Sequence, residues 1–498
     1  MGDQTVIVTL LMAVYLICAV ALSLYALATL VLLALYLRHR KTPPLPPPLV
    51  EFPKVVVQLP LYNERFVAAR LIDAAAGFDY PKDRFIVQIL DDSTDETARI
   101  AAAKAVEWAV KGIQVVHVRR ENRTGFKAGA LAYGLTLAQA DFGAEFAAVF
   151  DADFVPPPDF LQKMLPTLMA NPRLACVQAR WGHLNPFENP LTLMQTLALD
   201  GHFVVEQIAR SRGGLLMNFN GSGGVWRIAA IHEAGGWQDT TLTEDLDLSY
   251  RAQLKGWTFA YRPDVIVPAE LPASIGAYKQ QQARWARGGT QCLRRLLIPV
   301  WRTRGLSFGE RLMATVHLCQ YIVHPMMVLL ALLTPILLVT RAIQQVPLGS
   351  LGILSLVPPI LFVTSQAALY PNWARRSLAL PVLLVLGMGL SRSNTRAVLS
   401  GLFGGRGTFN RTPKTAGTRA QVDSPRMSFD WVWEAVFSLY TLGATIIAVR
   451  LLPSLVPYMA LYSLSYGVFA FFSARDAWLA YRAAWIQGRM VSPAKHTL

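Results

Sequence analysis

Charged side chains are scarce in this chain of 498 residues, of which only 16% are Asp, Glu, Lys or Arg. Soluble domains carry roughly 25%. The deficit is uneven, because residues 51–290 have an ordinary α/β composition while long uncharged runs lie on both sides of them. The shortage excludes a chain that is soluble throughout. It predicts an integral membrane protein with one soluble domain of about 240 residues, which is enough to bury a full core.

Cysteines and acidic residues are also few. The four cysteines are scattered and lack the spacing of a metal site, so we expect buried thiols in a reducing compartment. The 32 acidic residues face 47 Lys and Arg, which gives a net charge of +15. Many of these basic residues stand beside the apolar runs, where the positive-inside bias and anionic lipid place them. We therefore expect the lipid bilayer as a partner, and no nucleic acid.

The uncharged runs predict five membrane spans. The first, Val6–Leu37, is followed by Arg38–Lys41, which places that end in the cytosol. Ala379–Leu390 is too short to span and predicts an interfacial or re-entrant segment. This count places the N-terminus outside and the soluble domain in the cytosol. The four other predicted spans are Leu312–Thr340, Val346–Tyr370, Trp431–Val449 and Leu455–Phe472.

The chain then divides into a series of predicted segments. They are an N-terminal transmembrane helix (1–41), a Pro-rich linker (42–52), the soluble domain (53–290), an interfacial helix (291–310), a transmembrane helix pair (311–371), an interfacial segment with a basic loop (377–427), a second transmembrane pair (428–473) and a cytosolic tail (474–498).

Apolar segments alternate with helical patterns in the soluble domain. Strands are predicted at Lys54–Leu59, Phe85–Leu90, Val115–Val118 and Phe146–Phe150, and helices at Glu96–Val110 and Ala128–Ala138. This alternation predicts an α/β domain with a mostly parallel sheet, inserted between transmembrane helices. Ligands bind at the carboxyl ends of the strands in such sheets. Polar clusters follow three of these strands, at Tyr62–Glu64, Asp91–Asp92 and Asp151–Asp153.

Two acidic motifs have carboxylates placed where they could bind a cation or take a proton. Asp151 and Asp153 follow a strand directly and suit a hard divalent cation that shares its oxygen ligands with a diphosphate. A surface turn is the simpler alternative. Glu244 and Asp245 follow Thr243 at a predicted helix start, where Thr243 fits an N-cap and the acids favour the helix dipole. A carboxylate there can also take a proton from an acceptor hydroxyl.

A third motif, Gln281-x-x-Arg284-Trp285, closes the soluble domain. It predicts a sugar platform, because Trp stacks on the apolar face of a pyranose while Gln and Arg bind hydroxyls or phosphates. A packed amphipathic segment is the alternative. Lys127 is a candidate phosphate ligand or an ordinary solvated charge.

Taken in order, Asp92, Asp151-x-Asp153, Thr243-Glu244-Asp245 and Gln281-x-x-Arg284-Trp285 resemble the D, DxD, TED, QxxRW signature of family 2 inverting glycosyltransferases. These include cellulose, hyaluronan and mannan synthases. The stretches Val57–Glu64, Asp91–Asp95, Glu121–Leu131 and Phe219–Arg227 resemble the cellulose-synthase-like A group, the (gluco)mannan synthases. The resemblance covers about residues 50 to 300.

The resemblance implies a GT-A fold, a nucleotide-sugar donor, and Mg²⁺ or Mn²⁺. It implies a membrane of the inner, plasma or Golgi type with the catalytic domain cytosolic. The reaction would be a one-step displacement that turns an α-linked donor into a β-linkage. The implied donor-binding residues are Tyr62, Glu64, Asp92, Lys127 and Asp151, with Asp151 and Asp153 at the metal. Asp245 would be the general base beside Glu244. The implied acceptor-binding residues are Gln281, Arg284, Trp285, Asn220 and Gly221.

The segment Phe409–Lys414 resembles the gating loop of cellulose synthases. The matching positions are Phe409, Thr412 and Lys414, while Arg411 replaces the family's Val. A basic, lipid-facing loop is the alternative.

Three hypotheses for the whole chain follow. The leading one is a β-glycan synthase that polymerises hexose from GDP-mannose or UDP-glucose into β-mannan, glucomannan or β-glucan and extrudes the growing glycan. The second is a non-processive enzyme that glycosylates a lipid such as ceramide or diacylglycerol. The third is a catalytically silent membrane scaffold, against which the intact acidic set argues.

Overall fold

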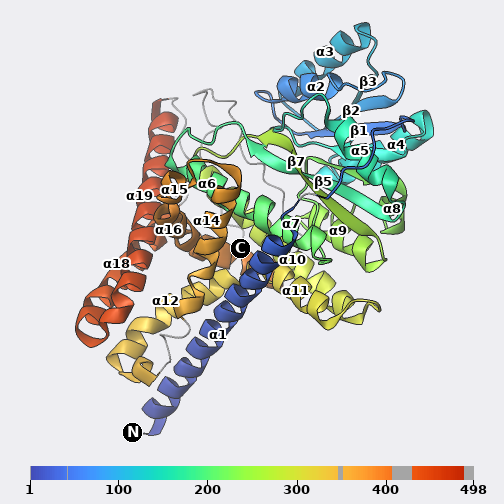
Figure 1. Ribbon diagram of the computed structural model, residues 1–498. Coiled ribbons are helices and arrows are strands. Elements are labelled where there is room, and N and C mark those ends of the chain that lie inside the picture. The colour runs from blue at the N-terminus through green and yellow to red at the C-terminus, as the bar shows by residue number, and fades with distance from the viewer. Residues whose placement is uncertain (1, 42, 346–351, 406–428, 487–498) are drawn as a thin grey trace.

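The computed structural model describes residues 2–41, 43–345, 352–405 and 429–486. They form a sheet domain and a set of long apolar helices that extend away from it, with α1 (Gly2–His39) reaching farthest (Figure 1). Arg212 at the end of α7 (Gln207–Arg212) donates to the carbonyl oxygens of His39 and Lys41, at 2.9 and 3.0 Å. This contact ties the end of α1 to the sheet domain.

The domain is built on one seven-stranded sheet with the order β3-β2-β1-β4-β6-β5-β7. All neighbouring strands are parallel except β6, which runs antiparallel to both β4 and β5. The prediction of a mostly parallel sheet, and of its first four strands, is confirmed. The strands are β1 (Val55–Leu61), β2 (Phe85–Asp91), β3 (Val115–Val118), β4 (Phe146–Val149), β5 (Leu174–His183), β6 (Gly224–Arg227) and β7 (Thr258–Ala269).

Helices cover both faces of this sheet, because its central strands are buried on both sides. Val55, Val57 and Leu59 of β1 pack on one face against α2 (Ala68–Ala76), α3 (Thr97–Val110) and α5 (Phe160–Ala170). Val56 faces the opposite cluster, which contains α4 (Phe126–Phe142), α8 (Ile228–Glu233) and α9 (Glu244–Leu254). The alternation follows the two-residue period of a strand. The predicted helices at residues 96–110 and 128–138 correspond to α3 and α4.

Two helical segments lead from the sheet domain towards the apolar helices. The first is α6 (Pro190–Asp200), which continues into a π-helix, η1 (Gly201–Glu206), and then into α7. The second is α10, a single helix from Ile275 to Arg302 whose start is capped by the Ser274 side chain. The structure therefore has no helix end at the predicted boundary between residues 290 and 291. The Gln281–Trp285 motif and the predicted interfacial segment belong to one helix.

Among the described residues, four helices are long and apolar enough to cross a membrane, and up to six if each of two bent pairs is one span. The four are Thr5–His39, Gly352–Leu369, Asp430–Leu451 and Pro453–Leu479, and the pairs are Phe308–Leu318 with Val323–Val339 and Trp373–Gly389 with Ser391–Phe403. The chain is a multi-pass membrane protein, and the predicted count of five lies within this range. The remaining elements are α11 (Phe308–Leu318), α12 (Val323–Val339), η2 (Ala342–Gln345), α14 (Val357–Leu369), α15 (Trp373–Ser377), α16 (Leu380–Gly389), α17 (Ser391–Phe403), α18 (Asp430–Leu451), η3 (Pro453–Leu455) and α19 (Val456–Ile486).

The predicted span Leu312–Thr340 is not one continuous helix. The helix is interrupted between α11 and α12, which are bent by 65° relative to each other. Pro325 lies in the first turn of α12, where its missing N–H and its ring prevent the helix from continuing backwards without interruption. The short apolar segment around Ala379–Leu390 forms α16 and bends by 42° into α17, which packs against α10. Its interfacial or re-entrant position stays a prediction.

Candidate active site

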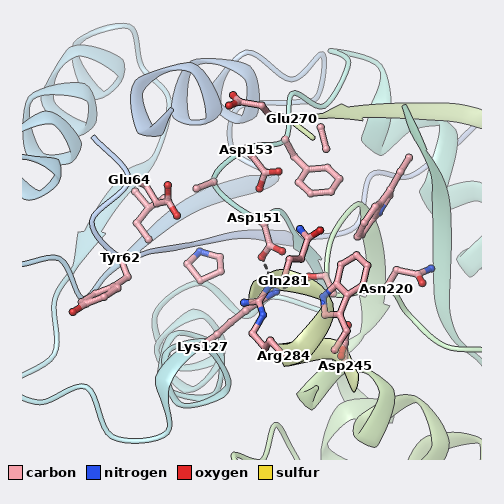
Figure 2. Close-up of a pocket in the computed structure, with 18 of the residues that line it drawn as sticks. Tyr62, Glu64, Lys127, Asp151, Asp153, Asn220, Asp245, Glu270, Gln281 and Arg284 are labelled. Atoms are coloured by element: carbon pink, nitrogen blue, oxygen red, sulfur yellow. Dashed lines mark hydrogen bonds and ion pairs between the residues drawn. The ribbon is translucent and has the colours of Figure 1, made fainter. Parts of the chain in front are cut away.

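A cavity of about 180 Å³ opens at the carboxyl edge of the sheet. It brings together every predicted site residue that the structure describes. The residues come from the segments after β1, β2 and β4, from the start of α4, and from α9 and α10 (Figure 2). The predicted loop residues Phe409, Thr412 and Lys414 lie outside the described residues. The predicted members that line the cavity are Tyr62, Glu64, Asp92, Lys127, Asp151, Asp153, Asn220, Gly221, Glu244, Asp245, Gln281, Arg284 and Trp285.

Strand register explains why the acidic clusters meet. Leu61 of β1 pairs with Asp91 of β2, and Gln58 pairs with Val149 of β4, so the three strands end at one edge. The loops after β1 and β2 are also bonded to each other, because Asn63 N donates to Ser93 Oγ at 2.8 Å. Asn63 has a φ of 56°, in the left-handed region that Asn tolerates better than most residues. The edge is therefore held by backbone pairing and by a rigid turn.

At the outer end of the cavity, two arginines hold predicted nucleoside-binding side chains. Arg120 forms a bidentate ion pair with Asp92, with Nε 3.0 Å from Oδ1. The Arg123 guanidinium lies over the Tyr62 ring, 3.3 Å from its centroid. Cation–π contact and bidentate pairing both fix planar groups in one orientation. A flat base could bind beside such a stacked pair.

Lys127 is the electrostatic centre of the cavity. Its Nζ lies 2.6 Å from Asp151 Oδ1, 2.8 Å from the Gly221 carbonyl oxygen and 3.6 Å from Glu244 Oε1. Burial alone would lower the pKa of Lys127, but the charges of Asp151, Glu244 and Asp245 raise it above its ordinary value. The side chain is therefore a fixed ammonium. It can compensate negative charge that develops on a phosphate in the same space.

Asp245 has the properties of a general base. Burial, followed by the charge of Glu244, raises the pKa of Asp245 to about 7, while Lys127 and the Leu246 N–H act to lower it. A pKa near the working pH suits proton transfer from a hydroxyl. Thr243 occupies the N-cap position of α9 but makes no capping bond. Its hydroxyl lies 3.3 Å from Cys292 Sγ instead. The start of α9 therefore places Glu244 and Asp245 at the cavity, while the Thr243 hydroxyl contacts Cys292 and does not cap the helix.

The backbone around Asp245 leaves no room for larger side chains. Gly221 has a φ of +83°, and a Cβ built on it would come 2.8 Å from Asp245 Oδ2. Gly288 on α10 is equally close to its neighbour, since a Cβ there would lie 2.6 Å from Thr243 Cγ2. The two glycines therefore allow close packing of the backbone, Gly221 against Asp245 and Gly288 against Thr243.

Asp151 and Asp153 are the residues that could hold a divalent cation. The Asp153 residue is 8% exposed, and the Asp151 side chain is 35% exposed and faces the cavity near Lys127 (Figure 2). In the part of the chain that the structure describes, no group of three or more His, Cys, Asp or Glu is arranged to hold a metal. Two carboxylates leave several coordination positions for oxygens from outside the protein. This donor set fits Mg²⁺ or Mn²⁺ bound together with a diphosphate.

The Gln281-x-x-Arg284-Trp285 motif faces the same cavity from α10. The spacing of three and four residues puts its side chains on one face of the helix. Figure 2 shows Gln281 and Arg284 projecting beside Asp151, Lys127 and Asp245. The platform and the reactive groups therefore share one space, as a site for transfer between two bound molecules requires.

Sequence reasoning missed several residues of this cavity. Trp181 and His183 come from the end of β5, and Glu270 follows β7. Trp181 Nε1 donates to the Ser222 carbonyl oxygen at 3.0 Å, and Glu270 pairs with Arg70 at 3.4 Å. No sequence motif marked them, because they reach the cavity through β5 and β7, which were not among the four predicted strands. Arg120 was also missed.

Known proteins resemble this chain most strongly in the sheet domain. Residues 53–288 match the family described as "Glycosyltransferase like family 2". "Glucomannan 4-beta-mannosyltransferase 2" of Arabidopsis thaliana is 46% identical over 261 residues, which cover 52% of this chain and 49% of that protein. "Glucomannan 4-beta-mannosyltransferase 1" of Oryza sativa subsp. japonica is 44% identical over 262 residues, covering 52% and 50%. The chain thus spans about half the length of the curated relatives it matches.

A solved structure agrees at the level of the fold. The mannosyltransferase PcManGT from Pyrobaculum calidifontis, in complex with GDP-Man and Mn²⁺, superposes with a TM-score of 0.53 at 20% sequence identity. The match covers 79% of this chain and 99% of that one. The GT-A fold predicted from the sequence is confirmed.

Proposed function

Residues 53–288 are a family 2 glycosyltransferase domain, and we propose that the whole chain uses it to polymerise hexose into a β-linked mannan or glucomannan. The donor would be GDP-mannose, with UDP-glucose as the alternative donor. The names of the relatives support the sugar. The proposal rests chiefly on one observation, the cavity that combines Lys127, Asp151 and Asp245 with the face of α10.

The proposed reaction follows from the positions of these groups. Asp245, ionised at or above neutral pH, takes the proton from an acceptor hydroxyl. That oxygen attacks the anomeric carbon from the side opposite the nucleotide. One C–O bond forms as the bond to the diphosphate breaks, so the configuration inverts and the nucleoside diphosphate leaves. The closeness of Glu244 and the burial keep the Asp245 carboxylate basic enough for this step.

The other residues hold the reactants and stabilise charge. Lys127 compensates charge on the diphosphate oxygens, and a divalent cation bound by Asp151 and Asp153 would supply further positive charge there. Tyr62, beneath Arg123, and Asp92, held by Arg120, would orient the nucleoside. Trp285, with Gln281 and Arg284, would hold the end of the growing glycan.

We further propose that the sheet domain lies on the cytosolic side and that the product leaves through the apolar helices. Arg38–Lys41 and other basic residues beside the spans support this orientation. The helix that carries the Gln281-x-x-Arg284-Trp285 motif also contacts the apolar helices, since Lys279 of α10 forms an ion pair with Glu434 of α18. The membrane itself would be a plasma, inner or Golgi-type membrane.

Membranes that contain the full chain test the proposal. They are incubated with radiolabelled GDP-mannose or UDP-glucose, and the product is digested with endo-β-1,4-mannanase and analysed for linkage. We expect a mannanase-sensitive polymer that depends on GDP-mannose. Asp245→Asn should bind donor but make no polymer, while Asp83→Asn, whose side chain is exposed outside the cavity, should behave like the wild type. A labelled glycolipid in place of polymer, or polymer from Asp245→Asn, would contradict the proposal.

A further inference from the structure

The π-helix η1 carries two titratable side chains that the proposed chemistry does not use. His202 and Glu206 lie four residues apart on it. π-helical turns are uncommon and frequently occur at functional sites. The turn is tightly packed at its start, since a Cβ on Gly201 would lie 2.7 Å from the Phe362 ring of α14. Its position is therefore fixed between the sheet domain and an apolar helix.

His202 connects Glu206 to a residue that lines the cavity. Its Nδ1 lies 3.0 Å from Glu206 Oε2, and its Nε2 lies 3.0 Å from Asn220 Oδ1. Burial alone would raise the pKa of Glu206, but the hydrogen bond and charge of His202, with the charge of Arg210, lower it. The carboxylate is therefore ionised and accepts from Nδ1. Nε2 donates as well when both ring nitrogens carry a proton, and the ionised Glu206 stabilises that cationic ring.

The Asn220 amide is consequently held in one orientation. Its Oδ1 accepts from His202 Nε2 and also from Asn218 Nδ2, at 3.0 Å each. Within the described part of the chain, its Nδ2 is buried and makes no hydrogen bond. An orphaned buried donor is unfavourable unless a ligand satisfies it. Asn220 and the next residue, Gly221, line the same cavity as Asp245, and the Gly221 carbonyl oxygen accepts from Lys127 Nζ at 2.8 Å.

We propose that His202 and Glu206 are positioning residues that aim the Asn220 amide so that its Nδ2 donates to an oxygen of the acceptor sugar. The inference rests on the proposed function, because it assumes that a glycan end occupies this part of the cavity. Asn220 touches the acceptor, and His202 and Glu206 act only through Asn220. Loss of either should therefore weaken acceptor binding and leave donor binding unchanged.

A double-mutant cycle tests this in the full chain, purified into lipid nanodiscs, with GDP-mannose as donor and β-1,4-mannohexaose as acceptor. We expect His202→Phe and Asn220→Ala each to raise the acceptor KM about tenfold, the effect of one lost hydrogen bond, with the donor KM unchanged. The double variant should be no worse than Asn220→Ala. His202→Gln, which keeps a donor at this position, should recover part of the loss. His232→Phe is the matched control, because the His232 side chain is exposed and its Nε2 lies 2.6 Å from the Gln139 amide oxygen, outside the cavity.

Several outcomes would overturn the inference. If the increases in acceptor KM of the two single variants multiply in the double variant, His202 acts independently of Asn220. An unchanged acceptor KM in His202→Phe would remove the positioning role. Glu206→Gln preserves side-chain shape and repeats the test if His202→Phe does not fold: a raised acceptor KM supports the role and an unchanged one overturns it. A wild-type chain that hydrolyses GDP-mannose but does not elongate the hexasaccharide would overturn the proposed function and this inference together, whereas elongation with normal variants would overturn the inference alone.

Discussion

Substitution of Gly221 by Ala should displace the Asp245 carboxylate while leaving the carboxyl group itself unchanged. The new Cβ would lie 2.8 Å from Asp245 Oδ2 and 3.5 Å from Lys127 Nζ. The carboxylate must then move by about half an ångström to restore ordinary contact. Since a misplacement of about 1 Å can reduce a rate about 100-fold, we expect kcat to fall about tenfold. The φ of +83° adds a stability loss of about 1–2 kcal/mol, because Ala is strained there.

Gly143→Ala separates these two effects. Gly143 also has a positive φ, of +68°, but a Cβ there meets nothing within 4 Å. It should show the same loss of stability and a normal kcat. Polymer synthesis from GDP-mannose at saturating donor gives kcat, and thermal unfolding followed by size-exclusion chromatography gives stability. Equal kcat values for the two variants would refute the idea that Asp245 is confined by the backbone of Gly221.

Three further predictions concern charge. Because the pKa of Asp245 is raised to about 7 and the base acts when ionised, kcat should fall as pH drops through 7, by about tenfold per unit at lower pH; a pH profile that is flat from 5 to 8 would contradict this. Lys279→Met should lower the free energy of unfolding by about 3–5 kcal/mol, because it leaves the Glu434 side chain, which is 1% exposed, without its partner. In thermal unfolding, Lys279→Met combined with Glu434→Leu should recover most of this loss. EDTA should abolish transfer and Mn²⁺ should restore it, with Asp153→Asn requiring more Mn²⁺ than Asp83→Asn for half-maximal activity.

Much of the sheet domain could be predicted because its signals are local. Val55–Leu61 and Phe85–Asp91 are mostly apolar runs, each with a single Gln, and polar residues lie at or just after their ends, so their strands and their shared edge follow from the sequence. The end of β5 could not be found in this way, because Trp181-Gly182-His183 has no such pattern and is paired only in the fold. Pro325 did signal the break between α11 and α12, but the apolar run around it suggested continuity.

Long-range contacts could not be predicted at all. The pKa of Asp245 depends first on burial, then on Glu244 beside it and on Lys127, which comes from a different helix far back in the chain. The contact between His202 and Asn220 depends on a π-helical turn, for which residues 201–206 carry no recognisable pattern. Sequence motifs therefore located the participants of the site, while the folded chain determines which of them are charged and which way they point.

The continuity of α10 fixes a dimension of the protein. At 1.5 Å per residue, its 28 residues form a rod about 42 Å long, with Trp285 about 15 Å from its start and Trp301 and Arg302 at its far end. If its basic, apolar last turns lie on the bilayer surface as predicted, the continuous helix also fixes the position of the Gln281–Trp285 motif relative to the lipid. Each new glycan unit would then be added at the same depth, and a change in bilayer thickness would shift the whole platform, not deform it.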